Sequence, residues 1–139
     1  MIESAVYAAV SAHAEVSAAL GGRLYPALAP ADAALPLAVY LGVGDREVLS
    51  VKGNVVLRGW AVHLDAYAES YAQAKTAAAG LLAAFQSLRG QTIGSGAYRV
   101  RSVRQESRDD AHLPPVQADE RGTFAVGLDL VVWYGTTGG

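Results

Sequence analysis

The sequence predicts an α+β fold, a two-layer sandwich in which two helices cover one face of a four-stranded, mainly antiparallel sheet. Two stretches carry apolar residues at helical spacing, and four others carry the alternation typical of strands. Their order is helix, strand, strand, helix, strand, strand (α-β-β-α-β-β). Consecutive strands joined by hairpin connections are antiparallel, and an antiparallel sheet can bury one face and leave the other open.

The composition sets the limits of this prediction. The chain has 139 residues, 52% of them hydrophobic, a charged fraction of 17%, a net charge of −2 and no cysteine. This length predicts one domain, residues 1–134, followed by a flexible tail, residues 135–139. Disordered chains, polybasic arms, disulfide frameworks, cysteine zinc sites and thiol nucleophiles are excluded.

The N-terminal residues and the apolar runs bear on location. Met1-Ile2-Glu3-Ser4 lacks the basic start and apolar stretch of a signal peptide. No apolar run approaches the ~20 residues of a membrane-spanning helix. We therefore expect a soluble protein made in a cytoplasm, with no membrane partner.

The first helix is predicted over residues 2–20 and the first strand over residues 37–43. Gly21-Gly22 ends the helix, because glycine accepts the left-handed backbone of a helix C-terminus. The helix stripe consists of Ile2, Val6, Val10, Val16 and Leu20. Alternation in the strand puts Leu37, Val39, Leu41 and Val43 on one side, and Ala38, Tyr40 and Gly42 on the other.

A long, polar-tipped hairpin connection over residues 44–54 leads to the second strand, residues 55–67. One side of that strand carries Trp60, Val62, Leu64 and Ala66, which predicts its core face. The second helix starts after Ser70, which forms a capping box with Gln73, and stops at Gly90.

The third strand is predicted over residues 98–104 and the fourth over residues 123–134. Gly94-Ser95-Gly96 before them is a hairpin-type turn. Residues 105–122 between the two strands form a polar loop of about 18 residues, a length that is unusual in a compact domain unless the loop has a function.

His63, Asp65 and Asp129 are the residues closest to a chemical site, because the predicted pairing places them on one sheet face. A histidine with two carboxylates can bind a metal or do acid–base work. Arg99 and Arg101 are expected on the same face, so cross-strand ion pairs are the simpler interpretation. We assign no catalytic, metal or cofactor-binding residue.

The two other histidines and the known motifs add no site. His13 is predicted to pack or to lie in an interface, and His112 to lie in the polar loop. Gly42-Val43-Gly44 lacks the third glycine and the helix of a dinucleotide site, and no phosphate-binding loop or Gly-x-Ser-x-Gly turn is present. The net charge argues against tight duplex binding.

The second sheet face is neither polar nor fully apolar, which indicates a subunit contact. Small, aliphatic and aromatic residues on this face mix with a few charged ones. The uncharged residues are Gly59, Ala61, Tyr67, Ala125, Gly127, Val131 and Trp133.

The chain resembles the small tail-completion, or tail-terminator, proteins of long-tailed bacteriophages, prophages and gene transfer agents. The resemblance spans about residues 2–134 and rests on the order and spacing of several short segments. These are Gly21-Gly22-Arg23-Leu24-Tyr25-Pro26, Ala34-Leu35-Pro36-Leu37-Ala38-Val39-Tyr40, Leu64-Asp65-Ala66-Tyr67-Ala68, Ser70-Tyr71-Ala72-Gln73-Ala74 and Leu128-Asp129-Leu130-Val131-Val132-Trp133-Tyr134. Tyr67 stands where many relatives carry a tryptophan.

The resemblance implies a structural virion protein that is not an enzyme. It implies a ring, commonly a hexamer, that caps the head-proximal end of the tail tube, stops tube polymerisation and joins the tail to the head connector. Its partners are then itself, the tube protein and the connector or neck protein; it needs no cofactor, and DNA only passes through. Assembly takes place in the bacterial host cytoplasm.

For the contacts between subunits and with partners we expect the mixed sheet face and the segments 44–54 and 105–122. The candidate interface charges are Arg46, Glu47, Asp65, Arg101 and Asp129. Two alternatives stay open. One is a neck or head-completion protein on the connector; the other is a small ligand-binding or hydrolytic domain that uses His63, Asp65 and Asp129.

Overall fold

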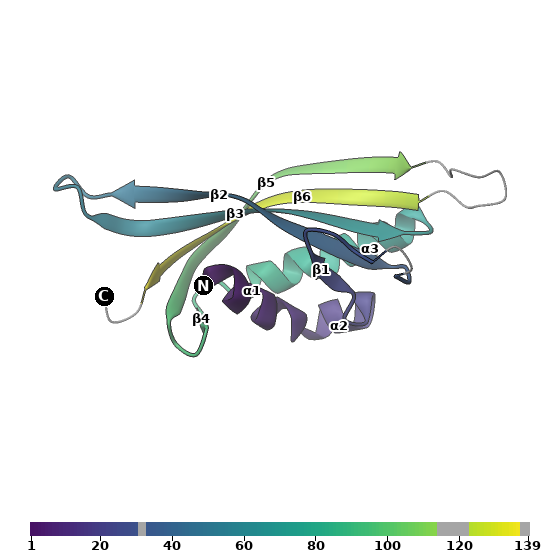
Figure 1. Ribbon diagram of the computed structural model, residues 1–139, viewed down its shortest axis with the longest axis horizontal. Helices are drawn as coiled ribbons and strands as arrows, with labels where there is room; N and C mark the ends of the chain where they lie inside the picture. The colour runs from purple at the N-terminus through teal and green to yellow at the C-terminus, as the bar shows by residue number, and fades with distance from the viewer. Residues whose placement is uncertain (31–32, 114–122, 137–139) are drawn as a thin grey trace.

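The computed structural model describes residues 1–30, 33–113 and 123–136, and the fold is a mixed α+β fold with three helices and a curled six-stranded sheet (Figure 1). The α+β class is confirmed, whereas the predicted two helices and four strands are too few. The helices are α1 (Ile2–Ser11), α2 (Ala14–Leu20) and α3 (Tyr71–Gln86). The strands are β1 (Leu24–Pro26), β2 (Leu37–Leu49), β3 (Val55–Ala68), β4 (Thr92–Ile93), β5 (Tyr98–Leu113) and β6 (Thr123–Thr136), in the sheet order β1-β2-β3-β6-β5-β4.

The predicted first helix is two helices, because the chain breaks at His13. His13 has the extended backbone of an N-cap, with φ −70° and ψ 135°, and its Nδ1 accepts a hydrogen bond of 3.2 Å from the Glu15 amide. This contact satisfies an amide that lacks a partner in the first turn of α2. The side chain therefore starts a helix, a role that the prediction of a packed or interface histidine missed. Gly21 ends α2 in the left-handed conformation, as predicted.

The two strands that the sequence does not reveal are short and lie at the sheet edges. β1 pairs in parallel with β2 over only three residues, Leu24–Pro26, and β4 pairs with the start of β5. The predicted turn at Gly94-Ser95-Gly96 connects β4 to β5, and all three of its residues have positive φ. Strands of two or three residues are too short for alternation to be visible in a sequence.

Most of the predicted connection over residues 44–54 is strand. β2 continues to Leu49 and β3 begins at Val55, so the turn comprises only residues 50–54. A β-bulge between Gly42 and Gly44 shifts the register of the β2–β3 ladder by one residue. Beyond the bulge the hairpin extends past the helices (Figure 1), and we call residues 44–57 the hairpin arm.

The predicted loop over residues 105–122 is also partly strand. β5 runs to Leu113, so His112 belongs to a strand and pairs with Phe124. Residues 114–122 lie outside the described residues. β6 ends at Thr136, two residues beyond the predicted end, and the rest of the predicted tail, residues 137–139, also lies outside the described residues.

Helix α3 begins where the sequence predicts. The Ser70 hydroxyl accepts a hydrogen bond of 3.2 Å from the Gln73 amide, the first half of the predicted capping box. Gly80 allows α3 to lie close to α2, since a Cβ at this position would be 3.3 Å from the carbonyl oxygen of Glu15. Small residues along α3 thus let the helices pack tightly.

The core lies between the helices and one face of the sheet. The predicted core face of β3 is confirmed, with Trp60, Val62, Leu64 and Ala66 all buried. On β2 the helix-facing residues are Ala38 and Tyr40, and the Tyr40 ring stacks on Tyr7 of α1 at 5.6 Å between centroids. The larger aliphatic side chains of β2 therefore point away from the helices. We call that side of the sheet the outer face.

Within the described part of the chain, no helix has the length and apolar character that crossing a membrane requires.

Candidate functional site

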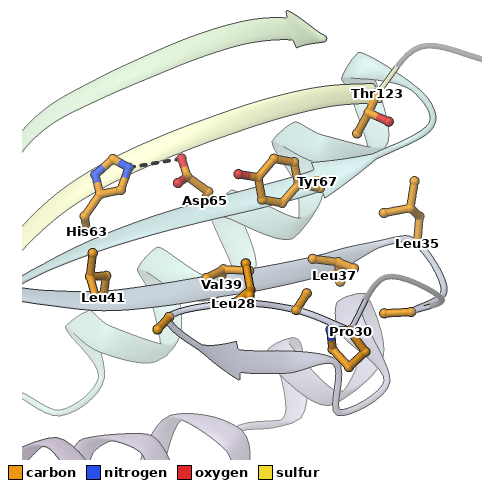
Figure 2. Close-up of a pocket in the computed structure, with 13 residues that line it drawn as sticks. Leu28, Pro30, Leu35, Leu37, Val39, Leu41, His63, Asp65, Tyr67 and Thr123 are labelled. Carbon is orange, nitrogen blue, oxygen red and sulfur yellow. Dashed lines mark hydrogen bonds and ion pairs between the residues drawn. The ribbon is translucent and has the colours of Figure 1, made fainter. Parts of the chain in front are cut away.

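The outer face carries an apolar groove of about 520 Å³ (Figure 2). One wall is a row of aliphatic residues on β2, and beside it runs a row of polar residues on β3. Residues 27–30, 33 and 35, which lie between β1 and β2, form the remaining wall. The labelled lining residues are Leu28, Pro30, Leu35, Leu37, Val39, Leu41, His63, Asp65, Tyr67 and Thr123. Leu28 is 82% exposed and Leu41 is 49% exposed, so the groove presents uncovered hydrocarbon to the solvent.

The register of β3 and β6 brings His63, Asp65 and Asp129 together, as the sequence predicts. His63 pairs directly with Asp129 across the β3–β6 ladder, and Asp65 lies two residues along β3 on the same face. His63 Nδ1 lies 2.7 Å from Asp129 Oδ1, and Nε2 lies 3.1 Å from Asp65 Oδ1. The hydroxyl of Ser107 on β5 donates a hydrogen bond to Asp129 Oδ2.

The two carboxylates change the protonation of His63. Partial burial acts to lower the pKa of His63, but the hydrogen bond to Asp129 and the negative charge of Asp65 outweigh it and raise the pKa above its ordinary value. The hydrogen bonds from Ser107 and His63 lower the pKa of Asp129. An imidazolium with both ring nitrogens donating to carboxylates is therefore favoured.

This arrangement is poorly suited to catalysis. A serine nucleophile needs its hydroxyl on the imidazole, whereas the Ser107 hydroxyl is bonded to Asp129. Both ring nitrogens of His63 already contact carboxylates, so neither is directed at a substrate or a metal. Among residues 1–30, 33–113 and 123–136 no group of three or more His, Cys, Asp or Glu side chains is arranged to hold a metal ion.

The predicted ion pairs of this cluster with Arg99 and Arg101 are wrong. The ion pairs that the structure describes for Asp65 and Asp129 are both with His63. A register shift between Val100 and Ser102 leaves Arg101 unpaired in the ladder, and its side chain lines a depression together with Arg58 and residues 55–57 of the hairpin arm. A bulge of this kind leaves no trace in the local sequence pattern.

The other candidate interface charges are paired on the surface. Arg46 makes a two-pronged contact with Glu106, at 2.6 and 3.2 Å, and so connects β2 to β5 over the two strands between them. Arg58 donates to Glu47 at 3.1 Å. Glu106 was not among the predicted interface charges, since a partner 60 residues away in the sequence leaves no local signal.

The hairpin arm overlaps the segment 44–54 that the sequence predicts as a polar contact for partners, but its exposed surface is largely aliphatic. Its aliphatic side chains are exposed to solvent: Val48 by 42%, Leu49 by 56%, Val51 by 107%, Val55 by 39% and Val56 by 57%. In the sequence, the valines and leucines on both sides of Lys52-Gly53-Asn54 indicate this aliphatic surface. A protein rarely exposes such a group of aliphatic residues unless they meet a partner.

Comparison with known proteins gives two positive findings. The family model of tail completion protein gp17 matches residues 4–135. Among solved structures, the chain is similar to one in the virion of a native gene transfer agent (GTA) particle, with a TM-score of 0.68 and 19% sequence identity, over 94% of this chain and 92% of the other. No curated protein matches the sequence.

The structural similarity shows the fold, and the family model shows the family. At 19% identity the GTA particle chain shares the fold, and this likeness covers nearly the whole of both chains. The family model also spans nearly the whole sequence, including the groove and the hairpin arm. The chain therefore belongs to the tail completion protein gp17 family and is a structural virion protein of a phage tail.

Proposed function

We propose that copies of this chain form a ring that caps the head-proximal end of the tail tube, stops tube polymerisation and joins the tail to the head connector. The protein acts in this role by shape and surface contact, without catalysis. Its partners are other copies of itself, the tube protein and the connector or neck protein, and DNA only passes through the ring.

One observation carries the proposal: the described monomer leaves uncovered aliphatic surface at two separate places, the groove and the hairpin arm. A ring needs a heterologous contact, in which two different patches of each subunit meet, and the rotation between subunits must close. Because the chain belongs to a tail completion family, a ring built by such a contact fits a role at the end of a tail.

The five candidate charges fit a part in setting the register of these contacts. Arg46, Glu47, Asp65 and Asp129 are already fixed by partners within the subunit, so they present an ordered charge pattern to a neighbour. Arg101 makes no ion pair with the described residues and is available to a partner carboxylate. Charges at an interface contribute more to specificity than to affinity.

Electron microscopy of purified protein mixed with tail tubes tests the proposal. We expect a cap on one end of each tube, and tubes that no longer elongate when tube subunits are added. Caps on both ends or along the walls, or continued elongation, would contradict it. A null mutant with tails of aberrant length supports a terminator, whereas normal tails without heads indicate a neck or head-completion protein.

The charges have their own test. We expect Asp65→Ala and Asp129→Ala to reduce the mass of the assembly measured by light scattering. Unchanged assembly with intact tails would remove both residues from the interface.

A further inference from the structure

We propose that the outer-face groove of one copy receives the hairpin arm of a second copy of this chain. This inference rests on the proposed ring and names the contact that builds it. The groove and the arm are formed by the same two strands at their opposite ends. The groove uses Leu37–Leu41 of β2 and His63–Tyr67 of β3, whereas the arm uses residues 44–57.

The chemistry of the two surfaces matches. The groove is lined mainly by aliphatic and proline side chains, and the arm ends in exposed valine and leucine side chains. Burying Val51 and its neighbours against Leu28 and Leu41 would remove both sets from water at once. Neither set has another cover among the described residues.

The charges of the arm and the groove are complementary. Lys52 at the tip of the arm is exposed and makes no ion pair with any residue that the structure describes. The polar wall of the groove carries the carboxylate of Asp65, which is 30% exposed. A lysine brought to this wall meets a carboxylate that is already oriented by His63. Complementary charge of this kind fixes the register of an otherwise apolar contact.

The positions of the arm and the groove favour a contact between two copies. Because the arm and the groove lie at opposite ends of the β2–β3 hairpin, one copy cannot place its own arm in its own groove. Each copy offers one arm and one groove, so the contact is head to tail and uses every arm when a ring closes. The arm spans about 17 Å from Gly44 to Leu49 at the ordinary strand rise, which is long enough to reach into a neighbour.

Disulfide trapping tests the contact, because the chain has no cysteine of its own. In the double variant Val51→Cys/Leu28→Cys, assembled on tail tubes and mildly oxidised, we expect a ladder of covalent oligomers on a non-reducing gel that ends at the ring number. A mixture of the two single variants can form only dimers by this contact. Gln86→Cys, an exposed position on α3, replaces Leu28→Cys in the control and gives no ladder.

A second measurement does not depend on trapping. We expect Val51→Asp to weaken ring formation by about tenfold or more, since one buried aliphatic contact is worth at least that factor in an association constant. Both Val51→Leu and the control Gln86→Asp retain the ring. Lys52→Glu weakens assembly less, and Asp65→Lys in the same chain restores it. Val51 is fully exposed in the monomer, so its substitution leaves the fold intact.

The outcomes separate this inference from the proposed function. Rings of normal mass on tubes, with no ladder and no effect of Val51→Asp, would overturn the arm-in-groove contact and leave the cap standing. Disulfide capture, by Leu28→Cys alone, of a tube protein that carries an introduced surface cysteine would assign the groove to a different partner and also overturn it. Monomers that never cap a tube would remove both.

Discussion

The two faces of the sheet differ in what covers them. The inner face is sealed by three helices, and its side chains Val62, Leu64 and Val132 are at most 1% exposed. The outer face keeps Leu41 half exposed and carries a groove and a hydrogen-bonded His–Asp cluster. One face therefore stabilises the fold, while the other has apolar surface left for partners. Substitutions of similar chemistry on the two faces should then have different consequences.

The largest difference is expected from a pair of leucine truncations. Leu64→Ala opens a cavity under the helices and should lower the free energy of unfolding by about 2–5 kcal/mol. Leu41→Ala on the outer face should cost less than about 1 kcal/mol, because the side chain is already half in water. Chemical denaturation of both variants measures the difference. Equal losses would mean that the outer face is as firmly packed as the core.

Two glycines that face tryptophans also test how firmly each face of the sheet is packed. A Cβ on Gly42 would lie 2.8 Å from Nε1 of Trp60, and a Cβ on Gly59 would lie 2.8 Å from the ring of Trp133. Trp60 is sealed in the core, so Gly42→Ala should destabilise the protein by about 1–3 kcal/mol. Trp133 is only partly buried, so Gly59→Ala should lower the stability less.

Gly135→Ala is the control for both glycine variants, since nothing lies within 4 Å of its Cβ position. Thermal unfolding of the three variants ranks them. A larger loss for Gly59→Ala than for Gly42→Ala would show that the outer tryptophan is the more constrained one.

The His63 cluster gives the outer face a pH dependence. The raised pKa of His63 stabilises the fold at pH values below its ordinary pKa of about 6.5, and this contribution is lost as the pH rises through the raised value. The lowered pKa of Asp129 contributes above about pH 4 and is lost as the pH falls through the lowered value. The substitution Asp129→Asn should therefore lower the free energy of unfolding most between about pH 4 and 6.5.

The expected cost of Asp129→Asn is no more than about 1 kcal/mol, because the paired side chains are about a third exposed and solvent screens them. An NMR titration should also show a lower pKa for His63 in this variant. The control is Asp45→Asn, since Asp45 lies on the neighbouring strand and makes no contact with His63 among the described interactions. An unchanged His63 titration in Asp129→Asn would contradict the described hydrogen bond.

The smallest effect is expected from the ion pair between Arg46 and Glu106. Both side chains are well exposed, so removing the pair with Glu106→Gln should change monomer stability little, and added salt should abolish the change. Glu47→Gln, which breaks the pair with Arg58, is the matched control. If either variant disrupts ring assembly while leaving monomer stability intact, that pair belongs to the contact surface.

The sequence predicts well what depends on neighbouring residues. The strand face of Trp60, Val62 and Leu64, the Ser70 cap and the turn at Gly94-Ser95-Gly96 are all local patterns, and the structure confirms them. Alternation in β3 and β6 also placed His63 with Asp129. Each of these features depends on the spacing of side chains along a helix, a strand or a turn, and this spacing can be read directly from the sequence.

What the sequence does not predict depends on distant partners. Alternation separates the two sides of β2 but does not say which one meets the helices, and the side with Ala38 and Tyr40 does so because the alanine-rich helices approach closely. The polar segments 44–49 and 105–113 are strands because a neighbouring strand pairs with them. The contact between Arg46 and Glu106 joins strands that are three positions apart in the sheet.

The bulge between Gly42 and Gly44 separates the hairpin into two parts with independent alternation. Before it, odd-numbered residues of β2 such as Leu41 face outward; after it, even-numbered ones such as Arg46 do. We therefore expect relatives to lengthen or shorten the arm by residue pairs without disturbing the helical layer. Such changes would alter how far each subunit reaches around a circumference, so the diameter of an assembly could evolve while its building block stayed the same.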